Sequence, residues 1–297
     1  RARVVNCHFE DCVADGLSLY TNVDVVVANC SARDCFRGGI TITGGASRIQ
    51  ISNFTAQGKI HASGIDVEVD GHGFEDSLRI ELTINGMLLP DGDFDIAVSD
   101  DSVVLGSNIA ARAPFYLAGR NSTIRISNSI FGVGRLSDTS NRIVFPGNTS
   151  FHHCRFEVDG DSGANQEIGA WAAIHVFWNI AGTSLKEQSL KLVDCEFRVG
   201  GKISREDVTY AVYSEPDMAA NRTRLVVDGG SIDSSFDHGV WLKQGGTALL
   251  HDVEIAAETP MRFGSANGWF VDAVIDGVTV AGTERYAEIP PHAPENK

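Results

Sequence analysis

Short runs of alternating apolar and polar residues recur along the whole chain. Ten of these runs share a period of two, which places successive side chains on opposite faces of a β-strand. They span residues 16–20, 39–43, 64–68, 94–98, 114–117, 142–145, 173–177, 210–213, 239–243 and 260–263. No amphipathic helix is apparent, and 31 glycines against 8 prolines suit many short strands joined by turns. The pattern predicts an all-β protein.

A repeat of about 23 residues accompanies these runs. Residues 4–12 (VVNCHFEDC) and 27–35 (VANCSARDC) share both cysteines, the asparagine and the aspartate before the second cysteine. We call the asparagine position the turn column, and it is predicted at Asn6, Asn29, Asn53, Asn85, Asn108, Asn128, His153, Asp194, Gly229, Asp252 and Gly277. An apolar residue follows three positions later, which predicts an inward-facing column at Phe9, Ala32, Ala56, Leu88, Ala111, Phe131, Phe156, Phe197, Ile232, Ile255 and Val280.

A repeat of this length, with two or three short strands and turn-forming residues, is typical of a parallel β-coil. Successive coils stack about 4.8 Å apart, which is the hydrogen-bonding distance between neighbouring strands. Asparagine suits the sharp turn because it tolerates left-handed backbone geometry, and stacked amides can bond along the column. A leucine-rich solenoid lacks support because the spacing of its leucines is absent, and a β-sandwich would not repeat at 23 residues.

On these repeats and columns, residues 1 to about 283 resemble the right-handed parallel β-helix family, the pectin-lyase-like solenoids. The resemblance implies an all-β, right-handed parallel β-helix solenoid of about 10–11 rungs over residues 1–284. Residues 285–297 contain three prolines and are expected to form a C-terminal tail or linker. Because the chain opens inside a strand-like run, we expect it to be truncated or processed at its N-terminus.

Composition and charge narrow the classes of partner. The chain is 43% hydrophobic and 21% charged, and no stretch approaches the roughly 18 apolar residues of a membrane span. Its 39 acidic and 24 basic residues give a formal charge of −15, which disfavours nucleic acid and anionic membrane surfaces as partners.

Six cysteines follow the repeat. Cys7, Cys30, Cys154 and Cys195 occupy one repeat position, whereas Cys12 and Cys35 share another. We expect the first four to be small buried residues of the coil interior. Neighbours such as Cys7 and Cys30 would lie near 4.8 Å apart, within the Cα window for a disulfide of about 4.4–6.8 Å.

The rungs lengthen in the second half of the chain, and the added residues fall in 157–172, 180–189, 200–208 and 214–224. Loops on a rigid scaffold commonly carry binding residues. They frame the predicted outward face of the second strand, where the early rungs show a bland series of Ser18, Thr41, Thr43, Asp66, Glu68, Ala97, Tyr116 and Val144. The later rungs show His175 with Phe177, Tyr213 with Glu215, Trp241 with Lys243, and Arg262.

Aromatic rings among charged groups are the composition of a carbohydrate site, since ring faces pack on pyranoses while charged groups bind hydroxyls or carboxylates. A lyase or epimerase acting on a uronic acid needs a cation and a base, and a hydrolase needs two carboxylates. The predicted catalytic residues are Tyr213, Lys243, Arg262, His175 and Glu215. The predicted substrate-binding residues are Phe177, Trp178, Trp241, Asp217, Asp237 and His238. For a hydrolase, the nearest candidates for the two carboxylates are Glu215, Asp217 and Asp237. The alternative for this patch is an ordinary solvated sheet face covered by loops.

No cofactor is predicted and no metal site is assigned. The one alternative is calcium, which hard carboxylate oxygens could bind at Asp66, Glu68 and Asp70, with Glu75 and Asp76 nearby. Alternating carboxylates on an exposed strand are usually only solvated.

The resemblance to phage tailspike depolymerases and polysaccharide lyases implies the expected function. The expectation is an extracellular or virion-associated protein that binds, and cleaves or epimerises, a uronic-acid-containing polysaccharide. The sequence motifs that characterise polygalacturonases, pectate lyases and mannuronan epimerases do not occur in their required order. The alternative is a non-catalytic adhesin, fibre or surface module. Exposed strand edges at the solenoid ends need a cover, so we expect either a homo-oligomer such as a trimer or additional domains there.

Overall fold

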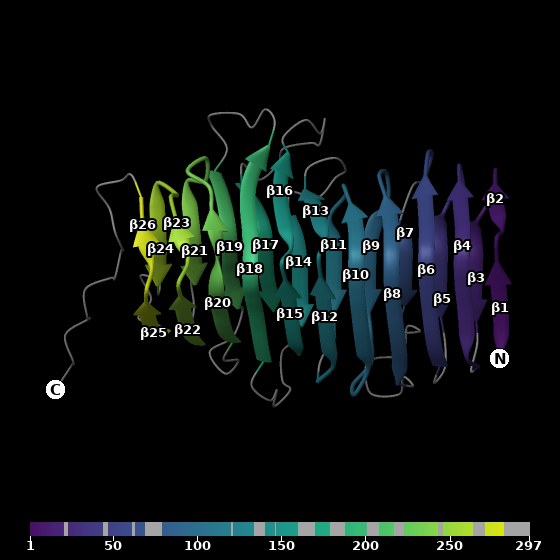
Figure 1. The fold of residues 1–297 in the computed structure, drawn as a ribbon, viewed down its shortest axis with the longest axis horizontal. Helices are drawn as coiled ribbons and strands as arrows, with labels where there is room; N and C mark the ends of the chain where they lie inside the picture. The colour runs from purple at the N-terminus through teal and green to yellow at the C-terminus, as the bar shows by residue number, and fades with distance from the viewer. Residues whose placement is uncertain are drawn as a thin grey trace.

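The computed structural model describes residues 1–20, 23–43, 47–60, 63–68, 79–119, 121–133, 140–145, 147–159, 170–178, 188–200, 208–216, 223–242, 246–263 and 271–281. Its strands stack in parallel coils along one axis, from the N-terminus at one end to β25 and β26 at the other (Figure 1). Every pairing between described strands is parallel, as the register of β4 with β6 and of β17 with β19 illustrates. The predicted all-β, right-handed parallel β-helix is confirmed. The predicted tail, residues 285–297, lies outside the described residues.

One face of the coil is a ten-stranded sheet, and its strands correspond to the ten alternating runs of the sequence. They are β3 (Asp15–Tyr20), β5 (Gly38–Thr43), β7 (Ser63–Glu68), β9 (Asp93–Ala97), β11 (Phe115–Ala118), β14 (Ser140–Phe145), β17 (Ala170–Trp178), β19 (Val208–Pro216), β21 (His238–Leu242) and β24 (Thr259–Phe263).

The remaining strands form a sixteen-stranded sheet. Its main path is β1 (Ala2–Val5), β4 (Val25–Arg33), β6 (Ser47–Gln57), β8 (Ile80–Leu89), β10 (Val103–Ala111), β12 (Thr123–Ser127), β15 (Asn148–His152), β18 (Gln188–Gly200), β20 (Thr223–Ile232), β22 (Gly246–His251) and β25 (Val271–Asp276). The side strands are β2 (His8–Glu10), β13 (Ile130–Val133), β16 (Arg155–Asp159), β23 (Glu254–Ile255) and β26 (Thr279–Val280). The described part of the chain holds no helix with the length and hydropathy needed to cross a membrane.

The turn column adopts left-handed backbone geometry, as predicted, at ten of its eleven assigned positions. Their φ angles are positive, from 48° at Asp194 to 71° at Gly229. The amide of Asn29 donates to Asn6 Oδ1 at 3.2 Å, and that of Asn53 donates to Asn29 Oδ1 at 3.0 Å. The stacked amides therefore tie consecutive rungs together at the turn.

The fourth rung departs from the prediction by one residue. Gly86, not Asn85, takes the positive φ (79°), because glycine enters this region without a Cβ penalty. The remaining positions of β8 shift accordingly, so Leu88 is 47% exposed while Leu89 is buried and pairs with Ala111. The assignments of Asn85 to the turn column and of Leu88 to the inward column were wrong. Asn85 still joins the ladder by accepting from Asn108 Nδ2 at 3.0 Å.

The interior is a stack of aliphatic and aromatic side chains. Phe131, Phe156 and Phe197 lie in one column, with ring centroids 5.9 Å and 5.0 Å apart in parallel stacking. All three are at most 1% exposed, and Phe115 and Phe151 pack beside them. Burial of such apolar side chains over successive rungs is a main favourable contribution to coil stability.

Most of the cysteines are also part of the interior. The predicted interior position is confirmed for Cys30, Cys154 and Cys195, which are buried, and Cys35 is buried as well. All six thiols are free, so the disulfide is not formed. Cys7 lies in the first rung and is half-buried because only one neighbouring rung covers it.

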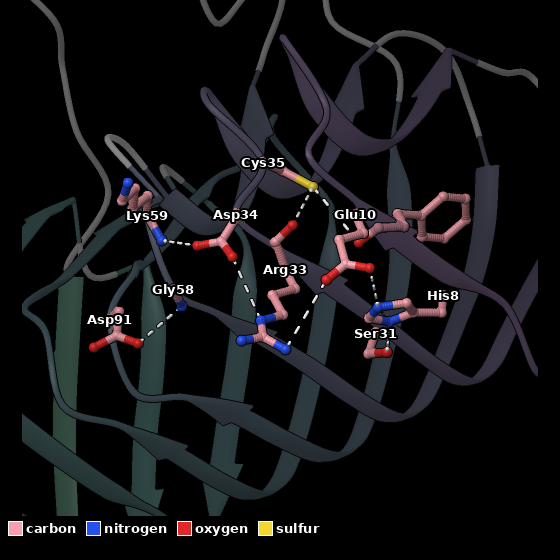
Figure 2. Close-up of polar contacts among 10 residues, drawn as sticks. His8, Glu10, Ser31, Arg33, Asp34, Cys35, Gly58, Lys59 and Asp91 are labelled. Atoms are coloured by element: carbon pink, nitrogen blue, oxygen red, sulfur yellow. Dashed lines mark hydrogen bonds and ion pairs between the residues drawn. The ribbon is translucent and has the colours of Figure 1, made fainter.

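A second corner of the coil is fastened by side chains that bond to the next rung (Figure 2). Asp34, itself at φ 52°, accepts from the Lys59 amide at 2.8 Å, and Asp91 accepts from the Gly58 amide at 3.0 Å. A Cβ on Gly58 would lie 2.4 Å from Asp34 Oδ1, so this turn requires glycine. Arg33 bridges outward to Asp34 at 3.4 Å. These contacts are structural, because they satisfy backbone donors at a turn.

Candidate site on the ten-stranded sheet

One outward-facing side chain from each strand of the ten-stranded sheet falls in a single line, which we call the outer column. Direct pairing along the sheet gives its members as Ser18, Thr41, Asp66, Asp95, Tyr116, Arg142, His175, Tyr213, Trp241 and Arg262. With strands about 4.8 Å apart, the seven intervals from Asp66 to Arg262 span about 34 Å. The column thus offers one continuous row of polar and aromatic groups.

The early half of this row is not bland, contrary to the sequence-based expectation. Asp95 and Arg142 are members of the outer column, whereas Ala97 lies further along its strand and pairs with Ala118. The alternation of β9 leaves both Asp95 and Ala97 outward, and only the register determines which of them continues the row. A register shift beside Ser63 brings Asp95 directly opposite Asp66. Val144 belongs to a strand with a similar shift, and the outer column passes through Arg142 instead.

In the late half, a local irregularity places an additional ring beside the row. Ala211 and Val212 are both fully buried, so Tyr210 and Tyr213 on either side of them both face outward. The same break recurs in β21, where His238 pairs with Tyr210 and Trp241 pairs with Tyr213. Strict alternation would put residues three apart on opposite faces. Tyr210 was therefore missed from the sequence.

The rings of this half are in mutual contact. The His175 and Tyr213 centroids lie 5.0 Å apart and those of Tyr213 and Trp241 lie 5.5 Å apart. Tyr210 stacks on His238 at 4.9 Å with an interplanar angle of 16°. The predicted residues His175, Tyr213, Trp241 and His238 thus form one cluster, together with the unpredicted Tyr210.

Arg262 closes the cluster at its C-terminal end. Its guanidinium carbon lies 4.4 Å from the Trp241 ring centroid, a cation–π geometry. The Trp241 indole N–H is buried and has no hydrogen-bond acceptor within the described ranges. A buried donor of this kind costs free energy unless an acceptor satisfies it.

Several predicted site residues are not covered by this geometry. Lys243 and Asp217 lie outside the described residues, as do most of the lengthened loops. For Phe177, Trp178 and Glu215 only the backbone is described, in β17 and β19, and Phe177 pairs with Glu215 as the predicted alternation requires. Their assignments stay predictions.

Asp237 has a defined structural environment. Its carboxylate accepts from the Thr209 amide at 2.7 Å and from the Thr209 hydroxyl at 2.8 Å, and its own amide donates back to that hydroxyl at 3.0 Å. The carboxylate therefore holds the start of β19 against β21. Through these bonds Asp237 positions Tyr210 and His238.

The early half of the outer column carries an acid pair, Asp66 and Asp95. Burial, followed by the nearby carboxylates Glu68 and Asp95, raises the pKa of Asp66 to about 7. The Ser63 hydroxyl donates a short hydrogen bond to Asp95 Oδ2. Burial and then Asp95 also raise the pKa of Tyr116, while Arg142 acts in the opposite direction.

A third acid, Asp15, stands beside the start of the column. Arg37 Nε donates to it at 2.9 Å and Ser18 Oγ donates at 2.9 Å. Burial favours a raised pKa, but the hydrogen bonds from Arg37 and Ser18 outweigh it and the pKa of Asp15 is lowered. Asp15 is thus a charged anchor, in contrast to Asp66.

The calcium alternative gains no geometric support. Among the described residues, no group of three or more His, Cys, Asp or Glu side chains is arranged to hold a metal ion. Of the residues considered for calcium, Asp66 and Glu68 are described, and Asp70, Glu75 and Asp76 lie outside the described ranges.

Comparison with known proteins gives one match. The family model described as a right handed beta helix region matches residues 1–73, about a quarter of the chain. None of the curated proteins and none of the solved structures compared with the chain matches it significantly. The match does not extend to a pectin-lyase or tailspike type. Together with the parallel coils, this partial match supports the right-handed parallel β-helix fold.

Proposed function

We propose that this protein binds an extended, uronic-acid-containing polysaccharide along the outer column and cleaves or epimerises it, in an extracellular or virion-associated setting. The observation that carries the proposal is the continuous contact of His175, Tyr213, Trp241 and Arg262 across four neighbouring strands. No other described part of the ten-stranded sheet combines rings and cations in this way.

The spacing of the column suits a sugar chain. Four strands span about 15 Å, and each interval of about 4.8 Å is close to the length of one pyranose unit. An extended chain lying along the coil axis would therefore meet one ring or cation per sugar. Half-buried rings bind the apolar faces of sugars, and the Arg262 guanidinium beside the Trp241 ring can bind oxygens.

Charge is compatible with an acidic sugar at short range. The net charge of −15 repels a polyanion from a distance, but ions screen this effect beyond about 8 Å at physiological salt. Arg142 and Arg262 stand in the column itself, on either side of His175 and Tyr213. Lyase or epimerase chemistry would use Arg262 to neutralise a carboxylate and Tyr213 or His175 as the base.

The test is a panel of uronic-acid polysaccharides incubated with the purified chain. Binding is followed by affinity electrophoresis, an unsaturated lyase product by ultraviolet absorbance, and hydrolysis by new reducing ends. Trp241→Ala should weaken binding about tenfold or more, because it removes a ring platform. Tyr20→Ala is the matched control, since Tyr20 is an aromatic residue of the same sheet that is 76% exposed and lies outside the outer column. Equal binding by both variants, or no binding by the unmodified chain, would refute the proposal.

One observation favours the alternative of a non-catalytic adhesin or fibre module. The sixteen-stranded sheet carries an open groove of about 450 Å³ with an apolar floor of Val226, Leu249 and Val274. Val274 is 60% exposed, and charged residues such as Arg224 and Asp228 line the rims. A surface of this composition is typical of protein contacts. Under this alternative the chain would assemble, for instance as a trimer, and analytical ultracentrifugation would show loss of assembly for Leu249→Lys.

A further inference from the structure

We infer that the groove on the sixteen-stranded sheet is a docking site for one amphipathic α-helix of a partner protein. The helix lies along the coil axis, with its apolar side on the groove floor and its C-terminal end at Lys191. This inference does not depend on the proposed function, because the groove and the outer column lie on different sheets.

The first argument is the composition of the groove floor. Strands β18, β20, β22 and β25 are consecutive in the sheet and lie at the C-terminal end of the described coil (Figure 1). Direct pairing places Val226, Leu249 and Val274 in one outward row, which holds Ser150 and Lys191 in the two preceding rungs. The coil interior is built from the alternate residues of these strands, so the fold does not need this outward stripe. An exposed apolar stripe confined to three rungs indicates a contact surface.

The second argument is the size of the groove. Arg224 and Asp228 stand on opposite rims, two residues to either side of Val226 on β20, so the rims are about 13 Å apart. An α-helix with its side chains is about 10–12 Å wide, which fits between them. The three intervals from β18 to β25 span about 14 Å, the length of about ten helical residues.

The third argument is the spacing along the floor, which distinguishes a helix from an extended peptide. One turn of a helix advances about 5.4 Å, close to the rung spacing of about 4.8 Å. Side chains one turn apart can therefore meet Val226, Leu249 and Val274 in succession. An extended peptide would turn a side chain to the floor only about every 6.6 Å, which does not match the rungs.

The fourth argument is charge along the groove. Lys191 and Arg224 line one end, where Lys191 also forms an ion pair with Asp228 at 3.8 Å. Asp276 lines the other end, on β25. A helix carries partial negative charge at its C-terminus and partial positive charge at its N-terminus. A helix whose C-terminal end lies at Lys191 and Arg224 therefore complements both ends of the groove.

The rims also differ in charge across the groove. Asp228, His251 and Asp276 are paired along one rim, and His251 Nδ1 lies 3.0 Å from Asp228 Oδ1. The exposed Arg224 stands on the opposite rim. We therefore expect the partner helix to carry acidic residues on the flank that faces Arg224 and basic residues on the flank that faces Asp228 and Asp276.

A second copy of this chain is a poorer occupant. Two identical grooves can face each other about a two-fold axis that runs either along the groove or across it. The first arrangement brings Lys191 against Lys191 of the other copy, and the second brings Asp228 against Asp276. Like charges meet in both arrangements, which opposes pairing of two copies.

The experiment uses a designed helical peptide of about 14 residues with one leucine per turn, glutamates on one flank and lysines on the other. Its glutamates face Arg224 when its C-terminal end lies at Lys191. A second peptide with the two flanks exchanged is the matched control. It can match the rims only by reversing its direction, which places its C-terminal end at Asp276, so it should bind about two- to fivefold more weakly.

Fluorescence anisotropy measures peptide binding, and circular dichroism should show a gain of helix in the bound peptide. Leu249→Lys places a charge on the floor and should weaken binding about tenfold or more. Val274→Gln changes a residue that is 60% exposed, so it keeps the fold, and it should weaken binding about threefold or more. Leu105→Lys is the control, since Leu105 is an exposed leucine of the same sheet outside the groove, and it should bind like the unmodified chain.

Thermal unfolding of every variant shows whether the fold is kept. Absence of binding to the unmodified chain at peptide concentrations up to about 100 μM would overturn the inference. Equal binding by Val274→Gln, Leu249→Lys and the unmodified chain would overturn it as well, and so would binding without a gain of helix. Self-association of the unmodified chain that Leu249→Lys abolishes, without peptide binding, would assign the groove to a second copy instead.

Discussion

Asp66 supplies the most direct test of the electrostatics described above, through stability rather than activity. Its neighbours Glu68 and Asp95 and its partial burial raise its pKa from 3.8 to about 7. The perturbation is Asp66→Asn, which keeps the shape of the side chain and removes the ionisation. The folded chain holds this proton more tightly than the unfolded chain does, so between pH 4 and pH 7 the folded state binds more protons.

The sign and size of the effect follow from that difference. The contribution of Asp66 to the free energy of unfolding is fully present below about pH 4, decreases as the pH rises towards 7, and stays constant above it. Three pH units correspond to at most about 4 kcal/mol. Because the group is only half-buried and solvent screens its neighbours, we expect about 1–2 kcal/mol. The free energy of unfolding of Asp66→Asn, relative to that of the unmodified chain, should therefore rise by about 1–2 kcal/mol from pH 4 to pH 8.

The assay is thermal and denaturant unfolding of both chains at pH 4, 5.5, 7 and 8.5. For a chain of this length, 1 kcal/mol corresponds to a shift of about 2–4 °C in the unfolding midpoint. Asp101→Asn removes one exposed carboxylate and controls for net charge, and its difference from the unmodified chain should not vary with pH. A difference between Asp66→Asn and the unmodified chain that stays constant from pH 4 to pH 8.5 would refute the reasoning.

Three further substitutions test the coil itself by denaturant unfolding. Gly39→Ala should destabilise by about 3 kcal/mol because its Cβ would lie 2.4 Å from the Gly64 carbonyl oxygen, and a neutral result would mean that neighbouring rungs can move apart. Phe156→Ala removes a ring stacked 5.0 Å from Phe197 and should cost about 3–5 kcal/mol, whereas a loss below 1 kcal/mol would contradict the packed interior. Asn53→Ala should cost about 1–2 kcal/mol because alanine resists a φ of 52°, and Asn53→Gly should cost less because glycine adopts this φ freely. The reverse order would show that the amide ladder, and not the turn geometry, dominates.

The site shows where sequence reasoning is strong and where it stops. Alternation predicted that His175, Tyr213 and Trp241 face outward together, and the ring contacts bear out that placement. The same alternation missed Tyr210, because two consecutive buried residues follow it and bring it back to the outer face. A break of this kind depends on how neighbouring rungs pack, and no residue type within β19 predicts it.

The acid pair was missed for a related reason. Both Asp66 and Asp95 belong to strands that the sequence predicts, but they lie 29 residues apart and their strands are offset by a register shift. A shift of one residue exchanges which side chains meet, because the side-chain period of a strand is two.

The sequence by itself determined the parallel coil, its repeat, its turn column and its interior. The chemical reason is that the left-handed preference of asparagine and glycine and the alternation of apolar residues are local properties, and they recur in every rung. Only the tertiary structure decided that Gly86 and not Asn85 makes the fourth turn, and which outward residues share one line. Register between rungs is set by packing and by bulges across the whole sheet, so the meeting of Asp66 with Asp95, and of Trp241 with Arg262, emerges only when the rungs are stacked.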